Sequence, residues 1–371
     1  MSILRRKTRT CTIGTLKLGS EHPVAIQTMT MGKTENVAAV VAEIKTVEDA
    51  GCDLVRVAVP NFDAAKAIPL IKEKIKIPLV ADIHFDPRLA IAALDYGADK
   101  IRINPGNFFD RSYLEKVILL AKKKNAALRI GVNAGSLEKD LWAKYGAPTP
   151  DALVESALRW VKFVEDLGFG NFVVSLKSSR VPTMIEAYQK FATAQSAGSL
   201  PPPPLHLGVT EAGPTLPGAI KSAVGIGTLL SQGIGDTIRV SIVDNIAKEV
   251  EVCREILKSL GLYSKEPGIV ACPTCGRIEI DLEKMVEEVS VALKHLKKSI
   301  RVSVMGCVVN AVGEAKESDF AIAGGRKAGA LYYKGELYKA NVPEAELVPE
   351  LLKLINKFPE QQDLLFVSRI K

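Results

Sequence analysis

The chain has 371 residues, more than one ordinary hydrophobic core accommodates, so one large domain and a smaller one are expected. Its composition, 47% hydrophobic and 25% charged, is typical of a soluble globular protein, and no segment approaches the roughly 18 apolar residues of a membrane span. The net charge of +7 is modest and the basic residues do not cluster with aromatic ones, which argues against a nucleic-acid-binding surface. The basic first residues lack an apolar segment behind them, so we expect a cytoplasmic protein without a secretory signal.

From residue 24 onward, short β-rich segments alternate with amphipathic helical ones. The predicted strands cover residues 24–29, 54–59, 79–84, 100–104, 128–133, 172–177, 205–210 and 237–242. Helical patterns follow, for example over 37–50, 114–124, 151–167 and 245–260, and glycines at 51, 97, 168 and 233 stand where helices should end. Eight such units fit either a (β/α)8 barrel or an open doubly wound sheet.

The two faces of the predicted strands distinguish these folds. Strands of an open parallel sheet are covered on both faces and are almost continuously apolar. Here apolar and polar residues alternate: Arg56 lies between two valines, and Arg102 between two isoleucines. A polar face shared by most strands of a parallel set indicates that this face is enclosed and lines a cavity. The alternation therefore predicts a (β/α)8 TIM barrel.

Cations dominate the inward face of the predicted barrel. Five of them share the inward parity, whereas only Asp82 and Glu211 are obvious acids inside or at the rim: Arg56, Arg102, Arg129, Lys177 and Arg239. Excess positive charge in a cavity of low dielectric favours an anionic ligand with more than one phosphate. Polar residues at or near the strand ends, where barrel active sites lie, are His84, Asn104, Asn133 and Ser241.

The alternation ends at a predicted linker, 261–268, which divides a barrel domain, 1–260, from a second domain, 261–371. The second domain should be a small α/β domain with strands at 268–271 and 301–305, helices at about 282–297 and 344–357, and a Gly-rich segment between 305 and 344. Cys272 and Cys275 follow the first of these strands, and Cys307 follows the second.

Three thiolates from two neighbouring strand ends are typical of an iron–sulfur site. A structural zinc site would need a fourth Cys or His, and His295, the only histidine of this domain, lies in the middle of a predicted helix. A redox-active Cys-Pro-x-Cys pair is the other alternative, but it leaves Cys307 unexplained. Glu314 is the nearest oxygen donor for a further ligand position, although a solvated loop carboxylate needs no such role.

Several motifs together resemble one known family over essentially the whole chain. They are Ala271-Cys-Pro-Thr-Cys-Gly-Arg277, Met305-Gly-Cys-Val-Val-Asn310 with Gly313-Glu-Ala315, Leu205-His-Leu-Gly-Val-Thr-Glu-Ala-Gly213 and Ile101-Arg-Ile-Asn-Pro-Gly-Asn107. The chain resembles the 4-hydroxy-3-methylbut-2-enyl diphosphate synthases of the methylerythritol phosphate pathway to isoprenoids. One departure is that Ala311 and Val312 replace the family's usual Gly-Pro, which changes the stiffness of the predicted loop before Glu314.

The resemblance implies a barrel followed by an iron–sulfur domain, and a reductive ring opening and dehydroxylation of 2-C-methyl-D-erythritol 2,4-cyclodiphosphate. Ferredoxin or flavodoxin would deliver two single electrons. The implied 4Fe-4S ligands are Cys272, Cys275, Cys307 and Glu314. The five barrel cations would hold the phosphates, and Glu211 would donate a proton. The remaining substrate-binding residues would be Asp82, His84, Asn104, Asn133 and Ser241.

Assembly follows from chain geometry. An eight-residue linker spans at most about 25–29 Å, and it leaves from the end of the barrel opposite its active-site mouth. We therefore expect a head-to-tail homodimer in which each cluster domain caps its partner's barrel, as the resemblance also implies. Two other functions remain open: a phosphate-binding barrel enzyme with a zinc-binding tail, and an electron-transfer protein with a cluster but no diphosphate affinity.

Overall fold

The computed structural model describes residues 3–107, 111–196, 201–263, 266–294, 296 and 298–358. The chain forms two compact units, Met1–Leu262 and Tyr263–Lys371. The predicted linker lies at this division, and its residues 264 and 265, like His295, are outside the described ranges.

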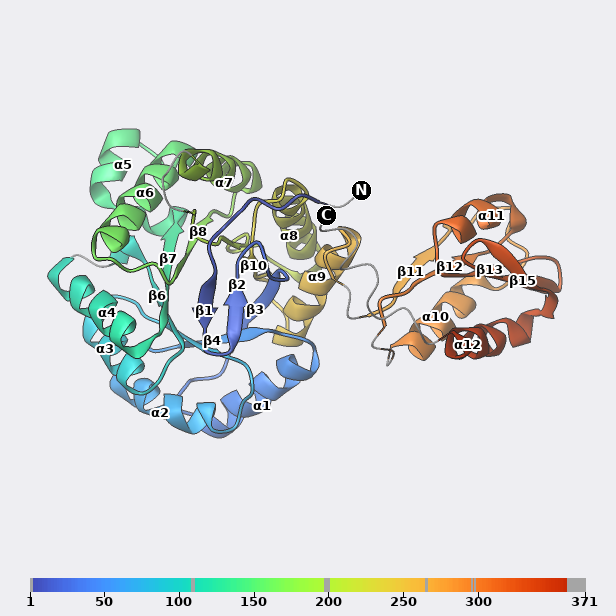
Figure 1. Ribbon diagram of the computed structural model, residues 1–371, viewed down its shortest axis with the longest axis horizontal. Coiled ribbons are helices and arrows are strands. Elements are labelled where there is room, and N and C mark those ends of the chain that lie inside the picture. The colour runs from blue at the N-terminus through green and yellow to red at the C-terminus, as the bar shows by residue number, and fades with distance from the viewer. Residues whose placement is uncertain are drawn as a thin grey trace. The chain divides into compact units, whose positions relative to one another are not determined.

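Eight parallel strands form the centre of the first unit, with helices around them (Figure 1). Their order in the sheet is β8-β7-β6-β5-β4-β3-β10-β9. The two ends of this order meet where Val174 pairs with Leu205, so the strands close into a ring, and the predicted (β/α)8 barrel is confirmed. The strands are β3 (Ala25–Met29), β4 (Leu54–Ala58), β5 (Leu79–Asp82), β6 (Lys100–Ile103), β7 (Ala127–Asn133), β8 (Phe172–Lys177), β9 (His206–Leu207) and β10 (Thr237–Ile238).

The outer helices begin and end at residues suited to those positions. Asn36, Asn61 and Asn245 each cap a helix by accepting a backbone N–H with the side chain, and the four glycines predicted to end helices all have positive φ. The helices are α1 (Val37–Asp49), α2 (Phe62–Lys72), α3 (Pro87–Asp95), α4 (Arg111–Lys124), α5 (Lys139–Tyr145), α6 (Pro150–Asp166), α7 (Val181–Ser196), α8 (Thr215–Ser231) and α9 (Ile246–Ser259), with single 3-10 turns at Pro105–Asn107 and Ala134–Ser136.

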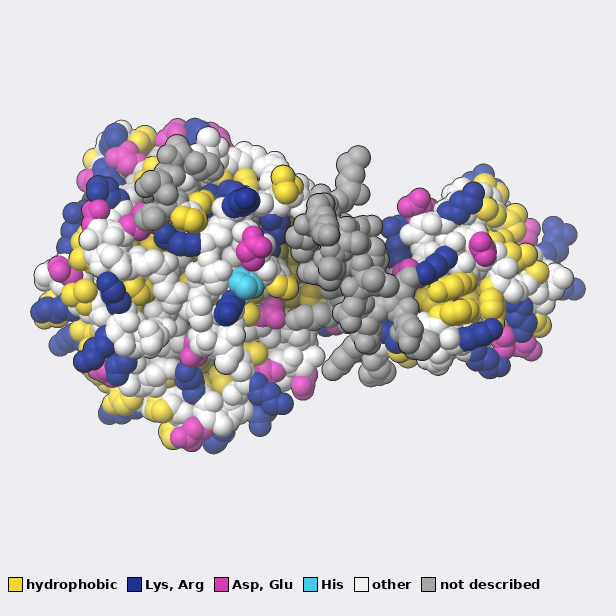
Figure 2. Space-filling view, viewed as in Figure 1, with side chains coloured by type: hydrophobic (Ala, Val, Ile, Leu, Met, Phe, Trp, Pro, Cys, Tyr) yellow, Lys and Arg dark blue, Asp and Glu magenta, His cyan; other side chains and the backbone are white. Residues whose placement is uncertain are grey.

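A short antiparallel hairpin that the sequence patterns did not predict precedes the barrel. Its strands are β1 (Cys11–Ile13) and β2 (Leu16–Leu18), which lie in front of the strand ring in Figure 1. Cys11, Ile13 and Leu18 are buried against residues in the lower part of the barrel strands, among them Leu54 and Val80. The hairpin therefore closes the base of the barrel, and Figure 2 shows acidic and basic side chains interspersed over this face.

A five-stranded sheet forms the second unit, in the order β11-β12-β13-β14-β15. The first three strands are parallel, and the last two are antiparallel to their neighbours. The strands are β11 (Gly268–Ala271), β12 (Arg301–Met305), β13 (Phe320–Ala323), β14 (Ala328–Tyr333) and β15 (Glu336–Pro343), and the helices are α10 (Leu282–Leu293), α11 (Val308–Lys316) and α12 (Leu347–Lys357), with a 3-10 turn at Glu344–Glu346.

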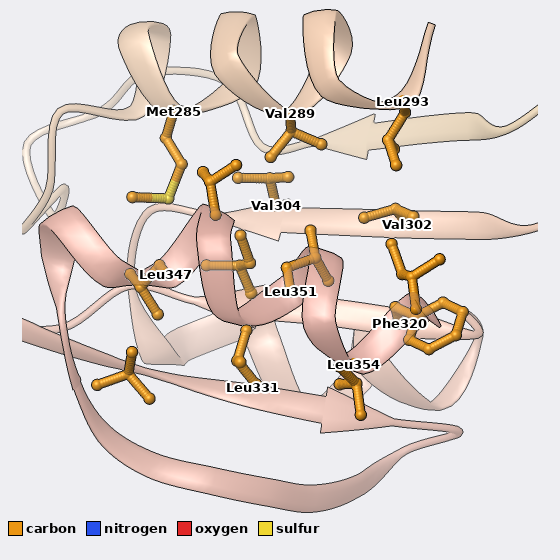
Figure 3. Packing of buried hydrophobic residues seen from close by; sticks show 14 of the residues in the cluster. Met285, Val289, Leu293, Val302, Val304, Phe320, Leu331, Leu347, Leu351 and Leu354 are labelled. Atoms are coloured by element: carbon orange, nitrogen blue, oxygen red, sulfur yellow. The ribbon is translucent and has the colours of Figure 1, made fainter. Parts of the chain in front are cut away.

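Alternating strand residues build a core on each face of this sheet. Val302, Val304 and Phe320 pack against α10 and α12, whose Val289 and Leu351 point toward them (Figure 3). Met305 and Ala323 have the opposite parity and pack with Ala311 of α11. The helices α10 and α12 thus cover one face and α11 covers the other.

The second unit differs from the sequence-based prediction after Cys307. The segment after Cys307 was expected to be a loop, but it forms α11, because Ala311 and Val312 permit a helix that Gly-Pro would interrupt. The Gly-rich segment between 305 and 344, for which no strand was predicted, contains β13, β14 and β15. No helix within the described ranges is long and apolar enough to cross a bilayer.

Candidate functional site

An interior network joins β5 and β6 at the carboxyl end of the barrel. Arg102 Nη1 lies 3.2 Å from Asp82 Oδ1 and 2.8 Å from His84 Nε2. Arg56 Nε approaches Asp82 Oδ2 at 3.8 Å, so one carboxylate is shared by two arginines. Burial of Asp82 opposes its charged form, but Arg56, His84 and Arg102 outweigh that effect and hold its pKa well below the usual range.

Arg129 and Lys177 have fewer partners: Arg129 pairs with Arg102 in the strand ladder, and Lys177 is the half-buried last residue of β8. Arg129 is 1% exposed, and its Nε and Nη1 have no hydrogen-bond partner among the described residues. Lys177 forms neither an ion pair nor a hydrogen bond with any residue that the structure describes. Burial, together with neighbouring arginines, lowers the pKa of both groups far below their ordinary values. These two cations are poorly compensated by the protein itself.

Two glycines leave the space that these long side chains occupy. A Cβ on Gly131 in β7 would lie 2.8 Å from Arg102 Nε. A Cβ on Gly208, after β9, would lie 2.7 Å from Lys177 Nζ and 2.5 Å from the Arg239 carbonyl oxygen. A larger residue at either position would displace a cation, so the barrel interior is shaped to hold them.

An acid missed by the strand pattern lies beside Arg239. Glu249 of α9 is buried, and its carboxylate is 3.4 Å from Arg239 Nη2 and accepts hydrogen bonds from Thr28 Oγ1 and the Ile242 N–H. A helical glutamate cannot be assigned to a barrel interior from strand parity, which is why it was missed. Even with Glu249, two buried carboxylates face the five predicted cations and the buried Lys100 of β6, and an anionic ligand would supply the missing charge.

The polar residues near the strand ends have different environments. Asn104 is buried and donates to Ser136 Oγ at 2.6 Å, which ties two loops together. Asn133 Oδ1 is buried without a partner among the described residues, and Ser241 is half-buried. Glu211 is exposed after β9 with φ of 54°, in the left-handed region that costs a non-glycine residue conformational energy.

A second candidate site lies at one edge of the second unit's sheet. Cys272 follows β11 and Cys307 follows β12, and the pairing of Ala271 with Val304 puts both strand ends at the same edge. The Gly306 N–H donates to Cys272 Sγ at 3.2 Å. Cys272, Cys275 and Cys307 are free thiols at or near the surface, and a hollow of about 480 Å³ lies beside Cys272.

This donor set fits a thiolate-bound iron–sulfur cluster in chemistry, since it offers three free thiols and a backbone N–H directed at one sulfur. Glu314 lies two turns into α11, about 10 Å along the helix from Cys307. Its carboxylate is 4.0 Å from Arg301, which begins β12 at the opposite edge of the sheet. Among the described residues, no three His, Cys, Asp or Glu side chains converge closely enough to hold a metal ion.

Family models match almost all of the chain. The model of the GcpE TIM-barrel domain matches residues 8–254, and that of the GcpE protein C-terminal domain matches residues 268–357. The chain belongs to the GcpE family. This membership agrees with the resemblance carried by the motifs around Cys272, Cys307 and Glu211.

Curated GcpE-family relatives are similar over nearly their full length. The protein of Caldanaerobacter subterraneus is 51% identical over 97% of this chain and 99% of its own. The protein of Clostridium perfringens is 52% identical over 95% of this chain and 99% of its own. The protein of Listeria monocytogenes is 50% identical over 99% of this chain and 97% of its own. All three are named 4-hydroxy-3-methylbut-2-en-1-yl diphosphate synthase (flavodoxin). Among solved structures, a Yersinia pestis dihydropteroate synthase matches with TM-score 0.48 and 13% identity, over 68% of this chain and 98% of that one.

Proposed function

We propose that this GcpE-family chain is a 4-hydroxy-3-methylbut-2-en-1-yl diphosphate synthase. It converts 2-C-methyl-D-erythritol 2,4-cyclodiphosphate to the linear allylic diphosphate and water, consuming two electrons and two protons. The observation that carries the substrate class is the excess of buried cations over Asp82 and Glu249 in the barrel. The names of relatives about half identical over nearly the whole chain support the reaction.

The substrate-binding role belongs to the inward side chains. Arg129 and Lys177 have unused donors and poorly compensated charge, which a bound diphosphate would neutralise. Arg56, Arg102 and Arg239 already share carboxylates, so they add charge while Asp82 and Glu249 fix their orientation. His84, Asn104, Asn133 and Ser241 complete the proposed set around the carbon chain.

The cluster-binding role belongs to Cys272, Cys275, Cys307 and Glu314, holding a 4Fe-4S cluster. When bound, such a cluster supplies single electrons and a Lewis-acidic iron. Because Glu314 lies along α11 from Cys307, its approach requires the second half of that helix to unwind and the ion pair with Arg301 to break. Loss of the ion pair costs little, since the pair is solvent-exposed.

Glu211 is the proposed proton donor to the departing hydroxyl. It lies on the loop after β9, at the end of the barrel where active sites are found, and its backbone adopts the left-handed conformation. Without a proton, the hydroxyl would have to leave as hydroxide, which is far less favourable than loss of water.

We further propose that flavodoxin, or ferredoxin in its place, delivers the electrons in the cytoplasm, and that the chain forms a head-to-tail homodimer. Exposed apolar side chains follow the ends of the barrel strands, among them Met31, Phe85 and Val243. Val308 and Val309, directly after Cys307, are also exposed. Apolar surface of this kind on each unit supports burial against a second copy.

Anaerobic turnover tests the proposed function. Protein reconstituted with iron and sulfide, supplied with reduced flavodoxin and the cyclodiphosphate, should yield the linear diphosphate by mass spectrometry. The Cys307→Ser variant should bind the cyclodiphosphate in calorimetry but form no product. A wild-type protein that fails to bind the cyclodiphosphate would contradict the proposal.

A further inference from the structure

Lys100 is a buried cation for which the proposed reaction gives no role. It is the first residue of β6 and shares the inward face of that strand with Arg102 and Asn104. Its side chain is 0% exposed, and Nζ donates to Gln27 Oε1 at 3.2 Å. Within the described part of the chain no carboxylate forms an ion pair with it. A fully buried ammonium group with one neutral partner is unfavourable, because nothing replaces its hydration.

The groups around Lys100 come from several strands and are mostly cationic or neutral. Burial lowers its pKa to about 7, and repulsion from Arg129 and then Arg56 acts in the same direction, whereas the Cys11 thiol opposes it. The facing groups are Arg102 on its own strand, Arg129 on β7, Arg56 on β4, Gln27 on β3, Cys11 on β1 and the neutral, fully buried His206 on β9, while β5 presents Val80. Among the described residues, the Gln27 carbonyl oxygen is therefore the main group that favours the charged form of Lys100, and it is itself neutral.

Lys100 lies directly below the proposed phosphate-binding residues. In the strand ladder it pairs with Val80 and Ala127, while Arg102, two residues further along, pairs with Asp82 and Arg129. A bound diphosphate would offset the charge of Arg129 and Arg56, the two cations that repel Lys100. In a cavity of low dielectric, that change is transmitted to Lys100 with little screening.

We propose that Lys100 is a positioning residue that is neutral in the empty barrel at pH 8 and takes up a proton when the diphosphate substrate binds above it. The proton comes from solvent and stays on Nζ, so no bond of the substrate changes. The added charge appears only when an anion is present to pair with it, which makes substrate binding proton-linked. This inference rests on the proposed function, since the cyclodiphosphate is the anion.

Calorimetry in buffers of different ionisation enthalpy tests the linkage. At pH 8, Lys100→Met should take up about one proton fewer per cyclodiphosphate bound than wild type. The affinity of wild type relative to that of Lys100→Met should fall by about tenfold per pH unit between pH 7 and 9. The difference between variants is the quantity to compare, because the pKa of Lys177 is also lowered, so that this lysine can take up protons as well. Lys17→Met, a change to an exposed lysine of β2, is the matched control and should behave as wild type.

A measurement without ligand separates this inference from the proposed function. Both tryptophans, Trp142 and Trp160, belong to the barrel unit, so their fluorescence reports its unfolding. A lysine that is neutral when folded and charged when unfolded makes the unfolded state bind more protons, so stability rises with pH above about 7. The unfolding constant of wild type relative to Lys100→Met should fall up to tenfold per pH unit between pH 7.5 and 9.5.

If the ratio of the unfolding constants of wild type and Lys100→Met stays constant between pH 7.5 and 9.5, the inference is overturned, whatever the substrate. Proton uptake in Lys100→Met equal to that of wild type would overturn it as well. Lys100→Arg, which keeps a permanent charge, should also lose the proton uptake, and it serves if the methionine variant does not fold. Failure of wild type to bind the cyclodiphosphate would instead contradict the proposed function, and the unfolding comparison would still decide the state of Lys100.

Discussion

Lys177 and Arg239 both line the barrel, but their carboxylate partners differ. Arg239 lies 3.4 Å from the buried Glu249, whereas Lys177 has no ion pair among the described residues. Removing either cation removes one partner of the bound diphosphate. Only removal of Arg239 leaves a buried carboxylate without its charge partner. The two variants should therefore both lose substrate affinity but differ in the free energy of unfolding.

We predict that Lys177→Ala and Arg239→Ala each weaken cyclodiphosphate binding by roughly 2–4 kcal/mol, the loss of one partner of a desolvated charge pair. Arg239→Ala should also destabilise the barrel by about 3 kcal/mol because Glu249 is left buried and unpaired. Lys177→Ala should leave stability unchanged or increased. Calorimetry and tryptophan-fluorescence unfolding measure the two effects, and unchanged binding in both variants would show that these side chains do not contact substrate.

We predict that Glu211→Gln lowers turnover by at least about a hundredfold, the usual contribution of a general acid, while substrate affinity and iron content stay near those of wild type. The amide keeps the size and hydrogen bonding of the side chain but cannot donate an acidic proton. Single-turnover kinetics and iron analysis provide the readouts. Near-normal turnover would remove Glu211 from the chemistry.

Strand parity predicted the interior cations, and the structure buries Arg56, Arg102 and Arg129 as expected. The same parity could have identified Lys100 and Gln27, which precede Arg102 and Met29 by two residues on their strands. Glu249 was not predictable in this way, because a glutamate on an amphipathic helix is ordinarily a surface residue. Its interior position depends on where α9 packs against β3, a contact between segments far apart in the sequence.

At the level of single elements, α11 differs most from expectation. It runs without interruption from Val308 to Lys316, with Ala311 and Ala315 buried against the sheet. Both residues suit a helix, whereas a proline inside it would remove a backbone N–H and clash with the preceding turn. The motif identified Cys307 and Glu314, but the number of residues between them does not indicate whether that segment is helical.

We predict that the double change Ala311→Gly and Val312→Pro destabilises α11 by about 3 kcal/mol and makes the cluster more resistant to chelation. The reason is that Glu314 no longer has to leave a stable helix to reach the iron. Loss of visible absorption under a chelator measures cluster retention. Adding Glu314→Gln should cancel the gain, and faster cluster loss in the double variant would mean that the helix itself supports the site.

The β1–β2 hairpin is the other element that the sequence did not predict. Its strands have three residues each, too short for a periodicity signal, yet they bury Cys11, Ile13 and Leu18. Most barrel strands and helices were predicted because each has a clear alternation or an N-cap followed by an amphipathic segment. The seventh and eighth strands are shorter than predicted, since regular pairing ends at Leu207 and Ile238.

For the whole molecule, the question is whether a barrel uses the cluster domain of its own chain or that of a partner. We predict that Lys177→Ala and Cys272→Ser, each inactive alone, recover about a quarter of wild-type activity when their chains are mixed and exchanged. Half of random dimers are mixed, and each mixed dimer regains one intact site of two if sites form between chains. No recovery, with exchange established by mass spectrometry, would show that each cluster serves its own barrel.

We propose that one chain joins a diphosphate-binding barrel to a 4Fe-4S cluster held at the β11–β12 edge. Iron and zinc analysis of protein purified without exposure to air tests it most directly. We expect a brown protein with about four irons per chain, and loss of iron in Cys272→Ser, Cys275→Ser or Cys307→Ser with unchanged tryptophan-fluorescence unfolding of the barrel. Stoichiometric zinc without iron in such a preparation would contradict it.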